Sequence, residues 1–230
     1  MPVTGLLYDV HGNLPALEAV LADAEAADVG RWVLGGDYAL FGAWPVETLA
    51  TLRSLPQATW IRGNGERWTA HPDAAPRDEV VQGAISACRE ALGPSAVDEL
   101  ASLPEQVVLD STRYCHASPV SDVRSFLPAA ADDEDELLGG VSEPRLVFGH
   151  THLPFRRTAQ TGIELLNPGS VGMPFDGDAR AAYAIIDADG RPHQRRVRYD
   201  HEASAAAVRE RFADAAWTAM VSGRIARATF

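Results

Sequence analysis

Three short apolar segments near the N-terminus constrain the fold of this chain more than any other feature. They cover residues 3–9, 32–35 and 59–61. Amphipathic segments with helical spacing separate them, the first beginning at Asn13 and the second covering residues 45–55. This alternation predicts a β-α-β-α-β unit, in which the strands form a parallel sheet with right-handed crossovers.

The second half of the chain has a different pattern. Residues 76–103 read as a helix that breaks at Gly93, and short strand patterns bounded by turn residues follow between positions 107 and 199. An alanine-rich helix is expected at residues 202–222. These patterns predict an α/β fold in which helices flank two sheets, the second of them largely antiparallel.

A chain of 230 residues can bury a core without a disulfide or a structural metal. We expect one domain at residues 1–200 and a C-terminal helical appendage at residues 201–230. In the appendage, Val208, Phe212 and Ala216 fall on one helical face. We therefore expect this helix to pack on the domain or on a partner subunit, and not on a substrate.

The composition excludes several functions. All 20 basic residues are arginine, so the chain lacks the lysine of a Walker-A phosphate loop and any lysine for Schiff-base chemistry. The 32 acidic residues bring the formal net charge to −12, which repels nucleic-acid backbones and anionic membranes in bulk. A phosphate-bearing substrate would need local positive charge from arginine or from metal ions.

The expected location is the cytoplasm. The first nine residues have no basic segment typical of a signal peptide, and no apolar run approaches the length of a membrane span. Cys88 and Cys115 form neither a metal motif nor a disulfide framework. We therefore expect a reducing compartment and no membrane partner.

Polar side chains follow each of the three N-terminal strands. Asp9 and His11 follow the first strand, Asp37 follows the second, and Asn64 follows the third. The carboxyl ends of parallel strands meet at the same edge of a sheet, which is where such sheets bind ligands. We therefore expect these four side chains to lie close together.

Histidines follow later strands in the same manner. His116 closes the strand pattern at residues 113–116, and His150 and His152 follow the apolar strand at residues 146–148. Residues two apart in an extended chain point the same way, so Asp9 and His11 are expected to converge, as are the last two histidines. Imidazoles and carboxylates at one edge favour a metal site over a proton relay. The candidate ligands are Asp9, His11, Asp37, Asn64, His116, His150 and His152.

Seven ligands are too many for one ion. If Asp37 bridges, each of two ions has four protein ligands and room for a shared hydroxide. The sequence therefore predicts a two-metal site, with the ions about 3.5–4 Å apart.

Five of these motifs together resemble those of the calcineurin-like metallophosphoesterases. They are Asp9-Val10-His11-Gly12-Asn13, Gly36-Asp37, Gly63-Asn64, His116 and Gly149-His150-Thr151-His152. The chain is most similar to the small bacterial and archaeal phosphodiesterase-like branch. The later loop Asn167-Pro168-Gly169-Ser170-Val171-Gly172 also resembles that branch. Each motif alone is weak, but five in this order are specific.

The resemblance implies a four-layer α/β sandwich, with two mixed β-sheets flanked by helices, and two divalent transition metal ions per chain. The metals it implies are Mn, Fe, Zn or Ni, of which we favour Mn. The implied ligands of the first ion are Asp9, His11, Asp37 and His152. Those of the second are Asp37, Asn64, His116 and His150. The implied nucleophile is a hydroxide that bridges both ions.

One position departs from the family pattern. Many members carry a histidine after the Gly-Asn pair, which is taken to protonate the leaving group, whereas this chain has Gly65. The next residue, Glu66, is a poor replacement, because two nearby cations would keep a carboxylate ionised. We expect Arg62 and Asn64 to contact the phosphate of the substrate.

The function favoured by these features is hydrolysis of phosphodiesters. One alternative is a phosphomonoesterase, such as a protein Ser/Thr phosphatase or a dinucleoside polyphosphate hydrolase. Another is a metal-binding scaffold with weak catalysis. The expected partner is a small phosphate ester, with nucleotides among the candidates, and a homo-oligomer remains an open alternative.

Overall fold

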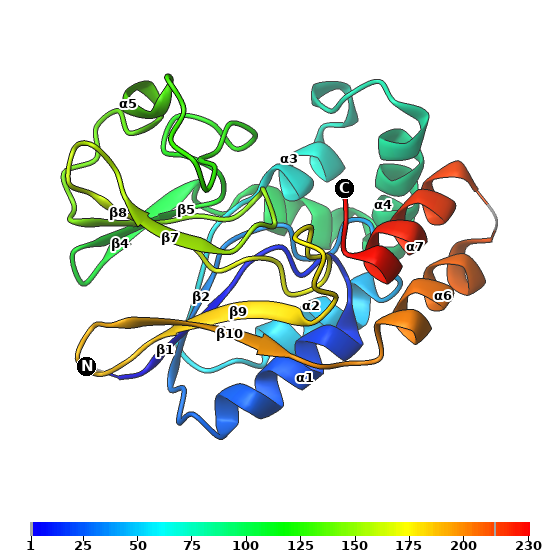
Figure 1. Cartoon of the computed structure of the whole chain (residues 1–230). Coiled ribbons are helices and arrows are strands. Elements are labelled where there is room, and N and C mark those ends of the chain that lie inside the picture. Colours follow the sequence, from blue (N-terminus) through cyan, green and yellow to red (C-terminus); the bar gives the residue numbers. More distant parts are fainter. Residues whose placement is uncertain (1, 214) are drawn as a thin grey trace.

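The computed structural model of the chain describes residues 2–213 and 215–230. Within them two five-stranded sheets face each other (Figure 1). The strands are β1 (Thr4–Leu7), β2 (Arg31–Leu34), β3 (Ala58–Trp60), β4 (Gln106–Leu109), β5 (Thr112–Cys115), β6 (Arg145–Val147), β7 (Phe155–Thr158), β8 (Glu164–Asn167), β9 (Ala181–Ile186) and β10 (Pro192–Val197). The helices are α1 (Leu14–Glu25), α2 (Pro45–Arg53), α3 (Asn64–Ala70), the short η1 (Pro72–Ala74), α4 (Glu79–Ala101), α5 (Glu134–Leu137), α6 (His201–Phe212) and α7 (Ala216–Arg227).

The first sheet has the strand order β10-β9-β1-β2-β3. Its strands β1, β2 and β3 are parallel, and α1 and α2 connect them, which confirms the predicted β-α-β-α-β unit. β9 pairs antiparallel with β1, and β10 with β9. Because β1 has a neighbour on each side, all four of its residues are buried, and the segment that follows it starts inside the molecule.

The second sheet, with the order β4-β5-β6-β8-β7, differs from the prediction. We expected a largely antiparallel sheet, but β5, β6 and β8 are parallel. Within this sheet, the two edge pairs are antiparallel, β4 with β5 and β7 with β8. The prediction was wrong because it took strands consecutive in sequence as neighbours in space, whereas β7 lies at the edge and β9 and β10 join the first sheet.

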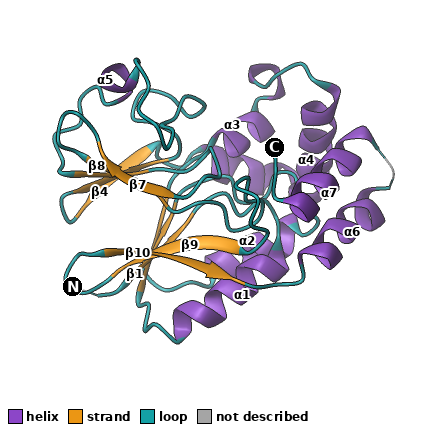
Figure 2. Ribbon diagram, viewed as in Figure 1, coloured by secondary structure: helices purple, strands orange, loops and turns teal. Residues whose placement is uncertain are grey.

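Four layers result from the packing of the two sheets (Figure 2). Leu6 of β1 and Val147 of β6 belong to the core between the sheets. Leu7 points to the opposite face of β1, as alternation along a strand requires, and shares a core with α1 and α2. Behind the second sheet, Phe148 packs with Leu137 of α5. The predicted four-layer α/β sandwich is therefore confirmed.

The C-terminal segment forms two helices, α6 and α7. The prediction of one helix over residues 202–222 was wrong, because Ala213 has a left-handed backbone with φ of 61° that ends α6. Asp214, within that predicted range, lies outside the described residues. α7 packs on α6 and α4, and its Trp217 shares a buried cluster with Cys88 of α4.

Two further expectations concern the helices. The predicted break at Gly93 is confirmed, since this residue has φ of 73° inside α4 and Pro94 follows it. None of the helices in the described part of the chain is long and apolar enough to cross a membrane.

Helix α3 was not predicted from the sequence. It begins at Asn64, directly after the loop that follows β3. Glu66 in its first turn accepts a hydrogen bond from the N–H of Gly63 at 2.8 Å, which satisfies one of the free donors at a helix N-terminus. Gly65 lies in the same turn and lowers the helix propensity, which explains why the pattern was missed.

Two glycines let neighbouring loops pack directly on the segment after β1. A Cβ atom on Gly42 would lie 1.8 Å from the carbonyl oxygen of His11, and one on Gly172 would lie 1.9 Å from that of Val10. Both contacts are with backbone, which cannot move aside cheaply. A Cβ atom on Gly30 would meet no atom within 4 Å, so Gly30 provides a matched control.

We expect Gly42→Ala and Gly172→Ala each to lower the free energy of unfolding by about 1–3 kcal/mol, as overpacking does. Gly30→Ala should change it by less than about 0.5 kcal/mol. Urea unfolding of the three variants measures the difference. Equal stability of Gly42→Ala and Gly30→Ala would show that the loop does not pack as described.

Candidate metal centre

The segments that follow β1, β2, β5 and β6 meet the first turn of α3 at one place in the molecule. Together they gather all seven side chains predicted as ligands, from both sheets. Six of the seven are buried and His150 is partly exposed. The buried six are Asp9, His11, Asp37, Asn64, His116 and His152.

Five of these seven residues have a left-handed backbone. The φ angles are 53° at Asp9, 49° at His11, 56° at Asp37, 67° at His150 and 58° at His152. This conformation costs roughly 1–2 kcal/mol for a residue with a Cβ atom, and such strain gathers at functional sites. The extended-chain argument for Asp9 and His11 was therefore wrong. β1 ends at Leu7, and the two side chains converge because the backbone turns.

Hydrogen bonds from two sides hold the turn after β1. The N–H of Asp9 donates to the carbonyl of Gly36 at 3.1 Å. On the other side, the N–H of Gly172 and the hydroxyl of Ser170 both donate to the carbonyl of Asp9, at 3.1 and 2.7 Å. These bonds offset the strain of the turn and fix the Asp9 carboxylate in place.

The last residue of β8, Asn167, also supports the segment that carries His150 and His152. The amide of Asn167 donates to the carbonyl of Gly149 at 3.1 Å and to the hydroxyl of Thr151 at 3.0 Å. Asn167 begins the motif of residues 167–172 that resembles the phosphodiesterase-like branch. Its role in this structure is to position the two histidines.

Three imidazoles are oriented by the backbone. Their Nδ1 atoms lie within hydrogen-bond distance of carbonyl oxygens: His11 with Leu40 (2.9 Å), His116 with Gly35 (2.9 Å) and His152 with Met173 (2.5 Å). In the neutral tautomer that donates from Nδ1, the Nε2 atom is unprotonated and its lone pair faces the site. Outer hydrogen bonds of this kind are typical of metal-binding histidines.

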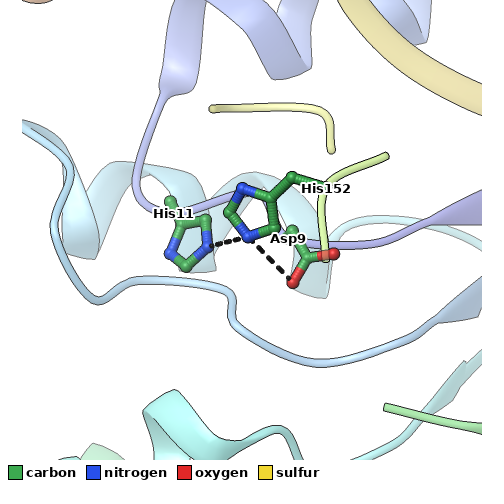
Figure 3. A group of neighbouring side chains, drawn as sticks. All are labelled: Asp9, His11 and His152. Carbon is green, nitrogen blue, oxygen red and sulfur yellow. Dashed lines mark hydrogen bonds and ion pairs between the residues drawn. The ribbon is translucent and has the colours of Figure 1, made fainter. Parts of the chain in front are cut away.

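One group of ligand atoms consists of Asp9, His11 and His152 (Figure 3). The Nε2 atoms of the two histidines are 3.1 Å apart, and that of His152 lies 3.5 Å from Oδ1 of Asp9. This oxygen is buried and has no hydrogen-bond partner among the described residues. In the tautomer that donates from Nδ1, the two Nε2 lone pairs face each other beside a carboxylate oxygen that accepts no hydrogen bond, which fits a cation between them.

A second group consists of Asp9, Asp37 and His116. Nε2 of His116 lies 3.5 Å from Oδ1 of Asp37 and 3.8 Å from Oδ1 of Asp9. The other oxygen of Asp37, Oδ2, lies 3.8 Å from Nε2 of His11. The two oxygens of Asp37 thus face imidazoles that come from different sheets.

Asn64 and His150 complete the second group. Oδ1 of Asn64 lies 2.9 Å from Nε2 of His116. In the reverse amide orientation, the nitrogen would donate to His116, to Nδ1 of His150 and to the carbonyl of Asp122. The reverse orientation satisfies the hydrogen-bonding groups of the neighbouring residues. The orientation with Oδ1 toward His116 instead directs an oxygen to the place where a cation would bind. His150 turns Nδ1 toward this group, in contrast to the other three histidines.

Burial shifts the pKa values of these groups. It raises the pKa of the Asp37 carboxyl to about 7. It lowers the pKa of His11 to about 3 and that of His150 to about 4, with neighbouring histidines adding to the effect. Burial opposes ionisation of Asp9 as well, but the surrounding histidines outweigh it and lower its pKa. In contrast, the carboxylates of Asp37 and Asp9 outweigh burial and raise the pKa of His116. A divalent cation bound at this site would take the place of the protons on these groups.

Glu66 is a supporting residue whose role was not predicted. It is buried, and its two oxygens accept hydrogen bonds from the N–H groups of Asp37, Tyr38 and Gly63 at 2.8–2.9 Å. The sequence signal was the glutamate at the third position of a helix. Because both oxygens are occupied by backbone donors, Glu66 ties the loop of Asp37 to α3.

A cavity of about 660 Å³ opens beside the gathered ligands. His11, Asp37, Asn64, His150 and His152 lie along one side of it. The rest of its wall is largely apolar and includes Phe41, Trp68, Val123, Leu127, Phe175 and Met220.

Helix α7 also lines this cavity, through Met220 and Arg224. We expected the C-terminal helix to pack on the domain or on a partner subunit and not on a substrate. The helix packs on α4 of the domain, and it also forms part of this cavity wall. Sequence periodicity identified the buried face of the helix but could not show what its other face meets.

Arg62, predicted to contact substrate, faces a different space. It lines a second cavity of about 390 Å³ together with His116 and Asp122. Its guanidinium pairs with the carboxylate of Glu105 and donates to the carbonyl of Ala101. Asn64, the other predicted substrate residue, lines the larger cavity.

Comparisons with known proteins agree with this geometry. A family profile for the calcineurin-like phosphoesterase superfamily domain matches residues 3–191. An uncharacterized protein of Methanocaldococcus jannaschii is 28% identical over 218 residues, which cover 85% of this chain and 87% of that protein.

Solved structures are similar over a longer range. A metallophosphoesterase from Sphaerobacter thermophilus superposes with a TM-score of 0.83 at 26% identity, covering 99% of both chains. A hypothetical protein from Pyrococcus horikoshii OT3 gives a TM-score of 0.86 at 18% identity, again over 99% of both chains. The similarity to the Pyrococcus protein shows that the two chains share a fold.

We expect two ions per chain when the protein is loaded with Mn²⁺. Asp37→Asn should weaken both by more than the roughly 10–100-fold that loss of an outer-shell partner costs, because the two oxygens of Asp37 face both groups. His193→Ala is the control, since His193 lies on the surface and pairs with Asp187. Elemental analysis and calorimetric titration give stoichiometry and affinity. One ion or none per wild-type chain in excess metal would contradict the assignment.

Proposed function

The chain belongs to the calcineurin-like phosphoesterase superfamily, and from this premise we propose that it is a dinuclear, metal-dependent phosphodiesterase. The observation that carries the proposal is the position of Asp37. Its two oxygens lie 3.5 and 3.8 Å from imidazole nitrogens of His116 and His11. A carboxylate so placed is suited to bridge two cations.

The residues divide into two sets around Asp37. Asp9, His11 and His152 would hold the first ion with it. Asn64, His116 and His150 would hold the second. When bound, two divalent cations supply Lewis acidity toward the phosphoryl oxygens and lower the pKa of a water molecule held between them. We favour Mn²⁺, although nitrogen and oxygen ligands also suit Fe, Zn and Ni.

The chain itself supplies a fixed arrangement for this chemistry. Backbone carbonyls orient three of the four imidazoles, those of His11, His116 and His152, and Glu66 holds the loop of Asp37. Ligands held rigidly before the substrate arrives need not reorganise during the reaction, which is the source of much electrostatic catalysis.

The cavity wall supports a diester substrate over a monoester. Near neutral pH a phosphodiester carries one charge and two organic groups, whereas a monoester approaches two charges with one organic group. The lining is largely apolar, and among its described residues Arg224 is the one arginine. Apolar walls can bind an organic group on either side of the phosphate.

We expect higher kcat/KM for bis(p-nitrophenyl) phosphate than for p-nitrophenyl phosphate, and dependence of both on added Mn²⁺. Faster turnover of the monoester would favour the phosphomonoesterase alternative. A protein that binds two ions but turns over neither ester would favour the metal-binding scaffold.

Gly65 bears on how the leaving group departs. A Cβ atom at this position would lie 2.8 Å from Oδ1 of Asp37, and the N–H of Gly65 donates to the same oxygen at 2.7 Å. A histidine here would therefore press on the proposed bridging carboxylate. Glu66 cannot replace it, because backbone donors occupy both of its oxygens.

Without a proton donor, kcat should fall steeply as the pKa of the leaving group rises, since general acid catalysis contributes about 10²–10⁴-fold. A series of substituted aryl phosphodiesters measures this slope. Glu66→Gln should lower stability by about 1–3 kcal/mol, because one backbone N–H loses its acceptor, yet it should leave the basic limb of the pH–rate profile in place. A flat slope in the wild type would reveal a proton donor and refute this reading.

A further inference from the structure

We propose that Arg224 binds a second anionic group of the substrate, separate from the phosphate that is hydrolysed. The inference rests on the proposed phosphodiesterase function, because it assigns a further subsite to the same cavity. The substrate class is then a phosphodiester that carries another phosphate, or a comparable anion, on one of its organic groups.

The guanidinium of Arg224 has no ion pair or hydrogen bond with any residue that the structure describes. Many other arginines are paired, as Arg67 is with Asp122 and Arg195 with Asp23. Asp78, the acidic residue whose charge acts on Arg224, uses its Oδ1 to accept from the N–H groups at the start of α4. It forms no ion pair with Arg224, so the arginine keeps its donors free.

The guanidinium of Arg224 lies over two aromatic rings. Its carbon atom lies 4.1 Å from the ring centroid of Phe230 and 5.7 Å from that of Phe175. Cation–π contacts of this kind fix the plane of a guanidinium while its N–H edges stay open. Burial lowers the pKa of Arg224, and the negative charge of Asp78 offsets this effect only in part, so the guanidinium has lost more hydration than the nearby carboxylate compensates.

The subsite lies one aromatic ring away from the candidate metal centre. Phe175 stacks on His152 with ring centroids 4.3 Å apart and an angle of 17° between the rings. Arg224 lies on this same phenylalanine. An anion bound by Arg224 is therefore not the phosphate at the metal centre but a second group on the same molecule.

Helix α7 presents Arg224 rigidly. Trp217, Val221 and Ile225 are buried on one face of the helix, while Met220 and Arg224, four positions apart, line the cavity. The N–H of Gly177 donates to the carbonyl of Ala228 at 2.9 Å, which ties the loop of Phe175 to the end of α7. The arginine and its aromatic support therefore belong to one packed unit.

Charge favours an anion as the ligand. The chain carries a net charge of −12, so anions are repelled from most of its surface, and a partly desolvated arginine offers a local exception. A guanidinium matches a phosphate through two parallel N–H bonds, which strengthen where water is scarce. An uncharged aryl group would leave these donors unsatisfied.

The test uses two substrates with the same scissile bond. These are the p-nitrophenyl ester of thymidine 5′-phosphate and the same ester with an added 3′-phosphate. In the Mn²⁺-loaded wild type we expect the added phosphate to raise kcat/KM about 10- to 100-fold, mainly through KM, as a charge-assisted pair does. Arg224→Met should lose this preference and Arg224→Lys should keep part of it. Arg227→Met, an exposed arginine on the same helix, should retain it fully.

A preference unchanged in Arg224→Met, or absent from the wild type, would overturn the proposal. Binding separates this result from failure of the proposed function. If the wild type hydrolyses neither ester, calorimetry with thymidine 3′,5′-bisphosphate and thymidine 5′-monophosphate decides. Tighter binding of the bisphosphate to wild type and Arg227→Met, but not to Arg224→Met, supports the subsite without hydrolysis. Equal affinities in all three proteins refute it.

Discussion

The arrangement of the candidate site depends on two buried carboxylates that have no arginine partner. Asp9 and Asp37 lie in the interior, and in the described chain the basic side chains within 4 Å of their oxygens are histidines. Removing one member of a buried ion pair commonly costs about 3–5 kcal/mol because the other charge is left uncompensated. The surrounding imidazoles, the left-handed turns and the glycines that admit close backbone contacts all place ligands around these two charges.

Much of the fold and the gathering of the site follow from local sequence patterns. The parallel part of the first sheet, β1 to β3 with α1 and α2, could be predicted because apolar strands and amphipathic helices alternate there. The ligands could be predicted to meet because each follows a strand. In contrast, the second sheet could not be ordered, since β7 and β8 form a hairpin whose second strand, β8, pairs with β6.

Other features depend on tertiary contacts that no local pattern encodes. The left-handed backbone at Asp9 and His11 exists because the segments after β2 and β8 hold it, and neither contact is visible from spacing. The placement of Arg62 was similarly hidden. Its place before Gly63-Asn64 predicts a contact with phosphate, and its ion pair with Glu105 could not be predicted from that motif. Arg224 had no motif at all, and only the packing of α7 on α4 brings it to the cavity.

The position of Asp9 between distant segments has a consequence for the order of events during synthesis. Its carbonyl accepts the hydroxyl of Ser170, 161 positions later, and its carboxylate accepts the N–H of His150, 141 positions later. Contacts so far apart in sequence form late, because long loops must close first. At a translation rate of roughly 5–20 residues per second, these partners emerge about 7–32 s after Asp9. During that interval the turn that carries Asp9 and His11 lacks the contacts with His150 and Ser170, so the arrangement of the candidate ligands is complete only after the C-terminal half has been made.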